Sequence, residues 1–206
     1  MRSPLHGAVG ERMALKDYYA DFEKYFWHCG DLGFWKLERQ QTFKEPGYDS
    51  WEAFWRGDWD ESLRLLETGR ADMAEYHSKV EQHGFVARRA RVVEEPLSDY
   101  MQWELHALRI RDQCGGPIHV TDAERVAQYE QDGPLPEIST LGNQVMYQAL
   151  YDEQGILVAA RKFVDRQLVL RCRELIVSVY NAGEPLAHWF NGHVAPLPPP
   201  QRQAPR

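Results

Sequence analysis

Residues that could bind or act on an anion are concentrated in one stretch of the chain, 87–108. Arg89 and Arg91 alternate along a predicted strand, so both point to one face of it, while Arg88 points to the other. A guanidinium pairs with a carboxylate or a phosphate through two parallel hydrogen bonds, so Arg89 and Arg91 could clamp an anionic ligand. Solvation at an edge strand, or pairing with a nearby glutamate, is the alternative without a function.

The start of the helix that follows adds further polar groups. Ser98 is a predicted N-cap for a helix over 98–113. Tyr100 and Glu104 lie one turn apart on the same face of this helix, and Trp103 is next to that face. Free N–H groups at a helix N-terminus beside arginines can bind an anion, and Glu104 could instead act as a base or orient a cation. The alternative is that the aromatic side chains only widen the apolar stripe of the helix.

A turn at Pro96 is expected to fold this helix back over its own strand, which would let Arg91 reach Glu104 or Tyr100. Phosphate-loop, dinucleotide-binding, nucleophile-elbow and zinc-protease motifs do not occur in the sequence, so no metal site and no cofactor are predicted. The candidate ligand- or partner-binding residues are Arg89, Arg91, Ser98, Tyr100, Trp103 and Glu104, and Glu104 is also the candidate catalytic residue.

The elements that must position these residues predict an α/β (α+β) fold. Hydrophobic periodicity indicates a mixed sheet of about five to six strands with helices packed on it. Helices at 98–113 and 166–182 are expected to pack on the sheet, and aromatic helices at 15–29 and 49–83 to form a lobe or lid. The strands are expected at 34–43, 85–93, 117–120, 137–141, 145–151 and 156–164.

The same patterns divide the chain into four parts. Residues 1–13 lack periodicity and are expected to be a disordered N-terminus, followed by a mainly helical aromatic lobe over 14–84. The α/β core is expected over 85–190, and the proline-rich tail 195–206 is expected to be disordered.

Charge and cysteine usage restrict the partners and the compartment. The formal net charge is −7, from 31 acidic and 24 basic residues, which disfavours general attachment to nucleic acid or to an anionic membrane. The 3 cysteines are far apart with no C-x-x-C pair, so no disulfide framework is expected. Neither a leader nor an apolar run near ~18 residues is present. The sequence therefore predicts a cytoplasmic protein without a membrane partner.

The run RVVEEPLSDYMQWEL at 91–105 resembles an uncharacterised actinobacterial family, the domain of unknown function 6879. Members show R-V-V-x-E-P-L-S-D-Y, an aromatic residue and E-L, then a short strand after a glycine and a strand–turn–strand around D-x-x-G; here these match 116–120 and 151–155. The element FWKLE at 34–38 resembles an aromatic R-L-E element of the family. This chain departs from the family at 145–148, where VMYQ replaces the usual W-L-F-D.

The resemblance implies a regulatory partner, because such domains are often encoded beside helix-turn-helix regulators. The order of elements also looks like half of a phospholipase D-type fold. The H-x-K-x(4)-D signature of those catalysts is absent, and the nearest analogue, His119-Val120-Thr121, lacks the lysine. A nuclease or phospholipase role is therefore disfavoured.

Three functional hypotheses remain open. The first is a non-enzymatic regulatory or signalling module that acts through a protein partner, a helix-turn-helix transcription regulator, and that can bind a small anionic ligand. The second is an enzyme on a small anionic or acyl substrate, with Glu104 as base and Arg89 or Arg91 as clamp. The third, disfavoured by the net charge, is direct nucleic-acid binding through Arg88, Arg89, Arg91, Arg109 and Arg111, which requires these side chains on one exposed face.

Overall fold

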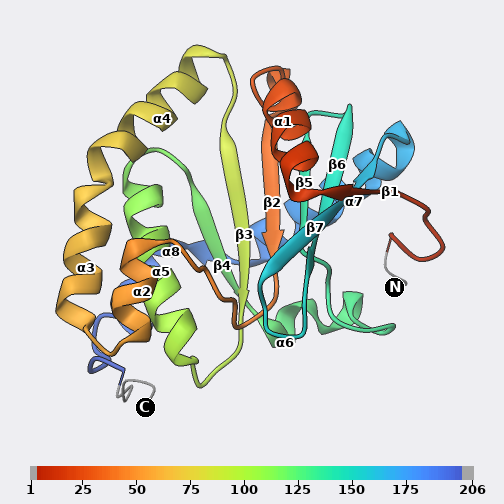
Figure 1. Ribbon diagram of the computed structural model, residues 1–206. Helices are drawn as coiled ribbons and strands as arrows, with labels where there is room; N and C mark the ends of the chain where they lie inside the picture. The colour runs from red at the N-terminus through yellow and green to blue at the C-terminus, as the bar shows by residue number, and fades with distance from the viewer. Residues whose placement is uncertain (1–3, 201–206) are drawn as a thin grey trace.

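A mixed sheet of 8 strands, in the order β1-β7-β6-β5-β2-β3-β4-β8, forms the centre of the molecule (Figure 1). The computed structural model describes residues 4–200. The neighbours β2, β3 and β4 run parallel, and the other pairings in this order are antiparallel. The strands are β1 (Glu11–Ala14), β2 (Phe34–Glu38), β3 (Ala87–Val93), β4 (Ile118–Asp122), β5 (Ile138–Leu141), β6 (Val145–Tyr151), β7 (Leu157–Phe163) and β8 (Glu184–Pro185).

Helices cover both faces of this sheet. One long helix, α7, lies behind the sheet in Figure 1, whereas α1 and α5 lie in front of it. The helices α2, α3 and α4 pack around α5, and α8 lies beside α5. The helices are α1 (Leu15–Phe26), α2 (Asp49–Trp55), α3 (Trp59–Thr68), α4 (Arg70–Gln82), α5 (Asp99–Gln113), α6 (Ala123–Val126), α7 (Arg166–Ala182) and α8 (Leu186–His193).

Strand alternation gives the two central strands one apolar and one charged face. The apolar face packs against α7 and forms the main core. The opposite face points toward α1 and α5 and carries charged side chains, which is unusual for the middle of a sheet. The apolar face presents Trp35, Leu37, Ala90 and Val92, and the charged face presents Lys36, Glu38, Arg89 and Arg91.

Side-chain N-caps start three of the helices, and the one predicted at Ser98 is among them. The Ser98 hydroxyl accepts a hydrogen bond from the Met101 N–H, 3.1 Å away, at the start of α5. Asp58 and Asp165 cap α3 and α7 in the same way. The α/β class and the principal strands are confirmed, but the sheet is larger than predicted because β1 and β8 add a strand at each edge.

Three boundaries differ from the predictions. Residues 11–13, expected to be disordered, pair with β7 as part of β1. The strand expected over 34–43 ends at Glu38, because the segment after it leaves the sheet, where the Gln41 side-chain amide donates to the Val92 carbonyl. In the tail, the Pro198 carbonyl accepts a hydrogen bond from the Gln102 side chain of α5, whereas 201–206 lie outside the described residues.

The first third of the chain does not form a separate lobe. Its strand β2 lies between β5 and β3 in the middle of the sheet, so residues 14–84 help to build the core that was expected over 85–190. Aromatic packing joins the helices to the rest, as where Phe54 of α2 stacks on Trp103 of α5 with ring centroids 5.7 Å apart. The half-phospholipase-D-like topology stays a prediction.

Candidate ligand-binding site

A cavity of about 760 Å³ lies over the charged face of β2 and β3, between α1 and α5. Its floor carries Lys36, Glu38 and Arg89 from the two central strands, and α5 supplies one wall. The segment 43–48, which links β2 to α2, lies at its rim. A cavity of this size, with aromatic walls and few polar groups that converge on it, is typical of a small-molecule site.

Glu38 is shared by two cations on the floor of the cavity. Its Oε1 lies 2.5 Å from Nζ of Lys36, and its Oε2 lies 2.5 Å from an Nη of Arg89. Burial acts to raise the pKa of Glu38, but the charges of Arg89 and Lys36 outweigh it and hold that pKa well below its ordinary value. Glu38 is therefore ionised, and its one negative charge faces two positive charges.

Arg91 and Glu104 form a buried ion pair between β3 and α5. The Glu104 Oε2 lies 2.8 Å from Nε and 2.7 Å from an Nη of Arg91, whose side chain is 0% exposed. Arg91 also donates to the Val92 and Gln40 carbonyls. Burial raises the pKa of Glu104, and Arg91 opposes that rise. The pair thus holds α5 on the sheet, and Arg91 is not among the side chains that line the cavity.

The remaining predicted site residues lie around the first turns of α5. Tyr100 and Trp103 line the cavity, and the Tyr100 hydroxyl donates to the Glu45 carboxylate, 2.6 Å away. Burial raises the pKa of Glu45 above its ordinary value. Ser98 stands outside the cavity, where its hydroxyl donates to the Gln41 carbonyl at 2.8 Å. The cavity therefore brings together Arg89, Tyr100, Trp103 and Glu104. Arg91 and Ser98 do not line it: Arg91 binds Glu104, and Ser98 caps α5.

Arg111 also lines the cavity, although the sequence suggested it only as a residue for nucleic-acid binding. It lies on α5 seven residues after Glu104, on the same helix face, which is the signal that could have identified it. Within residues 4–200 it has no ion-pair partner, but it forms a side-chain hydrogen bond with Tyr76, whose ring centroid is 5.9 Å from the guanidinium carbon. Burial first, and then the charge of Arg89, lower the pKa of Arg111 to about 10.

The cavity as a whole carries uncompensated positive charge. Arg91 is neutralised by Glu104, and Lys36 and Arg89 share Glu38. The charges of Lys44 and Arg111 are left over, and Glu45 is the one remaining carboxylate among the lining residues, so cations exceed carboxylates around the cavity. Such a site has an electrostatic preference for an anion.

The arginines of the nucleic-acid hypothesis do not share an exposed face. Arg88 lies on the opposite face of β3 from Arg89, with its guanidinium carbon 5.0 Å from the centroid of the Trp35 ring. Arg91 is fully buried. Phosphate contacts require accessible cations along one surface, so these five residues do not form a nucleic-acid footprint together.

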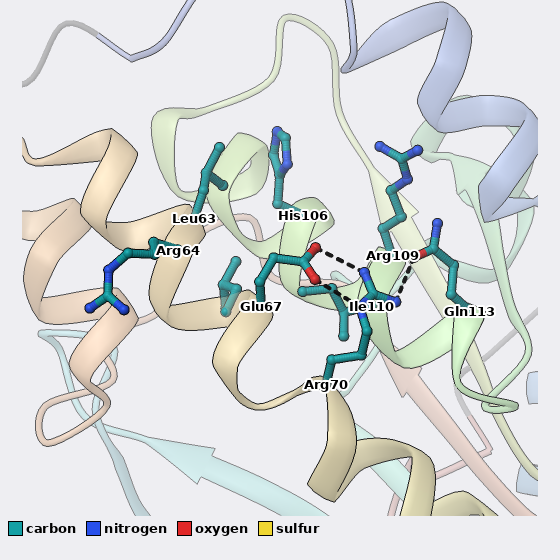
Figure 2. Close-up of a pocket in the computed structure, with 9 residues that line it drawn as sticks. Leu63, Arg64, Glu67, Arg70, His106, Arg109, Ile110 and Gln113 are labelled. Atoms are coloured by element: carbon teal, nitrogen blue, oxygen red, sulfur yellow. Dashed lines mark hydrogen bonds and ion pairs between the residues drawn. The ribbon is translucent and has the colours of Figure 1, made fainter.

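A second groove, of about 470 Å³, runs between α3 and α5 (Figure 2). Two of its three arginines are paired with carboxylates, Arg64 with Glu61 and Arg70 with Glu67. Figure 2 shows the Arg70 guanidinium held by Glu67 on one side and by Gln113 on the other. Arg109 lies over the Phe190 ring, 4.6 Å from the ring centroid. Arg109 has no ion-pair partner in the described residues, so the groove also keeps an excess of positive charge, but a smaller one than the central cavity.

Metal-binding clusters and membrane-spanning helices are both absent from the described residues. Among the described residues, no group of three or more His, Cys, Asp or Glu side chains is placed to hold a metal ion. In the same part of the chain, no helix combines the length and apolar character needed to cross a membrane. Neither feature adds a further site.

Fold and site together define an α/β domain with an open cationic cavity above its central strands. The sequence profile of a domain of unknown function, DUF6879, matches residues 20–191, and the chain belongs to this family. The match covers the strands from β2 to β8 and the residues that line the cavity, apart from Leu15 and Tyr19 of α1. No curated protein and no solved structure matches the chain.

Proposed function

We propose that this protein is a non-enzymatic regulatory domain that binds a small anionic ligand in the central cavity and acts through a protein partner. One observation carries the proposal: Arg111, Lys36 and Arg89 line one cavity, and Glu38 is the only carboxylate paired with any of them in the described residues. A ligand carboxylate or phosphate would supply the missing negative charge and accept bidentate hydrogen bonds from a guanidinium.

The direct test is ligand-dependent thermal stabilisation with citrate and inorganic phosphate as probes. Binding to the folded state raises the melting temperature in proportion to the logarithm of ligand concentration. We expect a saturable rise in the wild type and its loss in Arg111→Gln. Because multivalent anions also stabilise proteins by exclusion from the surface, the titrations are run at matched ionic strength against sodium chloride.

Arg125→Gln is the matched control, because Arg125 is an exposed arginine on α6, which packs on the apolar face of the sheet away from the cavity. It should respond to the anions like the wild type. Equal responses of the wild type, Arg111→Gln and Arg125→Gln would mean that the cavity is not the anion site, and the proposal would be abandoned.

The regulatory part of the proposal concerns the partner. It is supported by the family resemblance and by the absence of catalytic motifs from the sequence. Affinity capture from the native host, with an unrelated acidic protein as the control bait, should enrich a helix-turn-helix regulator. Capture without any DNA-binding regulator above the control would remove this part of the proposal and leave anion binding to stand alone.

An enzyme with Glu104 as base is the second candidate, because Glu104 lines the cavity and burial raises its pKa. The geometry is less favourable, since Glu104 Oε2 is already bound twice by Arg91. Profiling of anionic and acyl substrates would decide the matter. Turnover that disappears in Glu104→Gln, with the circular dichroism spectrum unchanged, would establish the enzyme in place of the binding domain.

A further inference from the structure

A smaller cavity of about 340 Å³ adjoins the central one on the side of α3 and α4. The two cavities share four lining residues, Tyr48, Met73, Ala107 and Arg111. Arg111 therefore stands at the junction, with its charge accessible from both.

The two cavities differ in their chemistry. Cations are gathered in the central cavity, where Lys36 and Arg89 lie on the floor. The side cavity is walled mainly by Leu66, Ile110 and the ring of Tyr76, and its one carboxylate, Asp72, is exposed. An apolar pocket beside an uncompensated guanidinium suits a molecule with one anionic end and one apolar end.

We propose that the ligand is an amphipathic anion, whose carboxylate or phosphate binds Arg111 and the floor of the central cavity and whose aliphatic or aromatic arm fills the side cavity. This inference rests on the proposed anion binding and specifies the class of ligand. Arg111 supplies the charge at the junction, and Met73 and Ala107 bound the passage on the helices α4 and α5.

The apolar arm of the ligand leads to a quantitative prediction for its affinity. Burial of each methylene contributes about 0.8 kcal/mol, which is roughly a fourfold gain in affinity per methylene. In isothermal titration calorimetry with acetate, butanoate, hexanoate and octanoate, Kd should fall with each added methylene until the side cavity is full. Octyl phosphate should bind like octanoate if the head-group site takes either anion. Octylamine, which has the same arm and the opposite charge, should not bind.

Cavity-filling variants locate the arm. Gly69→Leu and Ile110→Phe, at positions that line the side cavity and not the central one, should weaken octanoate by tenfold or more and leave the response to citrate unchanged. Ala74→Leu is the control, since Ala74 is an exposed alanine of α4 that lines neither cavity. Melting curves of the unliganded variants show which of them fold, and the chain-length series on the wild type stands without them.

Each outcome separates the two proposals. Citrate binding that depends on Arg111, combined with no gain along the carboxylate series, would overturn the amphipathic ligand and leave anion binding intact. Octylamine binding as tight as octanoate would show that the arm binds without a charge requirement, and this would also overturn the inference. Failure of every anion to bind would overturn both proposals.

Discussion

Arg111 destabilises the unliganded protein, because its charge is half-buried, has no ion-pair partner in the described residues and is repelled by Arg89. Arg111→Gln removes this destabilisation. We expect it to raise the free energy of unfolding by about 1–2 kcal/mol, a value reduced from the pKa shift to allow for solvent screening. Urea denaturation measures it. A binding residue that destabilises its own fold is the expected trade-off between stability and function.

A decrease in stability of the unliganded Arg111→Gln variant would contradict this interpretation. It would mean that the contact of Arg111 with the Tyr76 ring outweighs the repulsion. Arg125→Gln again serves as control, since its exposed pair with Asp122 should change stability by less than about 1 kcal/mol.

The Arg91–Glu104 pair makes the opposite prediction. Glu104→Ala leaves a fully buried guanidinium without its carboxylate, which is expected to cost about 3–5 kcal/mol. Replacement of both partners by apolar residues of similar volume, Arg91→Met with Glu104→Leu, should recover most of that loss. Denaturant unfolding of the wild type, Glu104→Ala and the double variant measures the loss and its recovery. A Glu104→Ala variant with wild-type stability would show that the pair does not hold α5 on the sheet.

Glu137 should give the protein a distinctive pH dependence. Its Oε1 accepts the backbone N–H groups of Arg39 and Gln40, both at 2.6 Å, while its Oε2 has no hydrogen-bond partner in the described residues. Burial, and then the charge of Glu38, raise the pKa of Glu137 to about 7. A raised carboxyl pKa stabilises the fold at low pH, and that contribution is lost as pH rises from about 4.5 to about 7.

Glu137→Gln isolates this contribution, because glutamine keeps an acceptor for the two N–H groups and does not titrate. The difference in unfolding free energy between the wild type and Glu137→Gln should change by about 3 kcal/mol between pH 4 and pH 8, with the wild type losing stability as pH rises. A difference that is constant with pH would contradict the raised pKa.

At the scale of elements, the start of α5 couples the helix to the segment that edges the cavity. Ser98 caps the helix through Met101 and donates to the Gln41 carbonyl. Ser98→Ala should lower stability by about 1–2 kcal/mol and also weaken anion binding, because both the helix start and the segment beyond β2 are loosened. Asp58→Ala removes the cap of α3, which is remote from the cavity floor, and should lower stability without a change in binding.

Local sequence signals predicted most elements well and failed where tertiary contacts decide. Ser98 marked the start of α5 correctly because capping is a local interaction. The edge strands β1 and β8 gave no signal, since strands of 4 and 2 residues are too short for a period to be read. The aromatic residues of α2 were read as a lobe because helical spacing says nothing about which helix they pack on, here Trp103 of α5.

At the scale of the whole molecule, the site was predicted only where its residues lie close in sequence. Arg89, Tyr100, Trp103 and Glu104 come from one stretch and meet in the cavity. Lys36 and Glu38 lie in the strand predicted over 34–43, but the parallel pairing of β2 with β3 that brings them to Arg89 spans more than 50 residues. No spacing rule reveals such a contact, so the charge imbalance around Arg111 is visible only in the folded chain.

The location of the bound anion is the most direct test of this account. Amide hydrogen exchange is followed in the wild type and in Arg111→Gln, with and without saturating citrate. We expect citrate to slow exchange in the wild type at 43–48, the segment at the rim of the cavity. In Arg111→Gln, citrate should leave the exchange rates of this segment unchanged. Slowed exchange confined to 63–70, along the α3–α5 groove of Figure 2, or slowed equally in both proteins, would contradict the account.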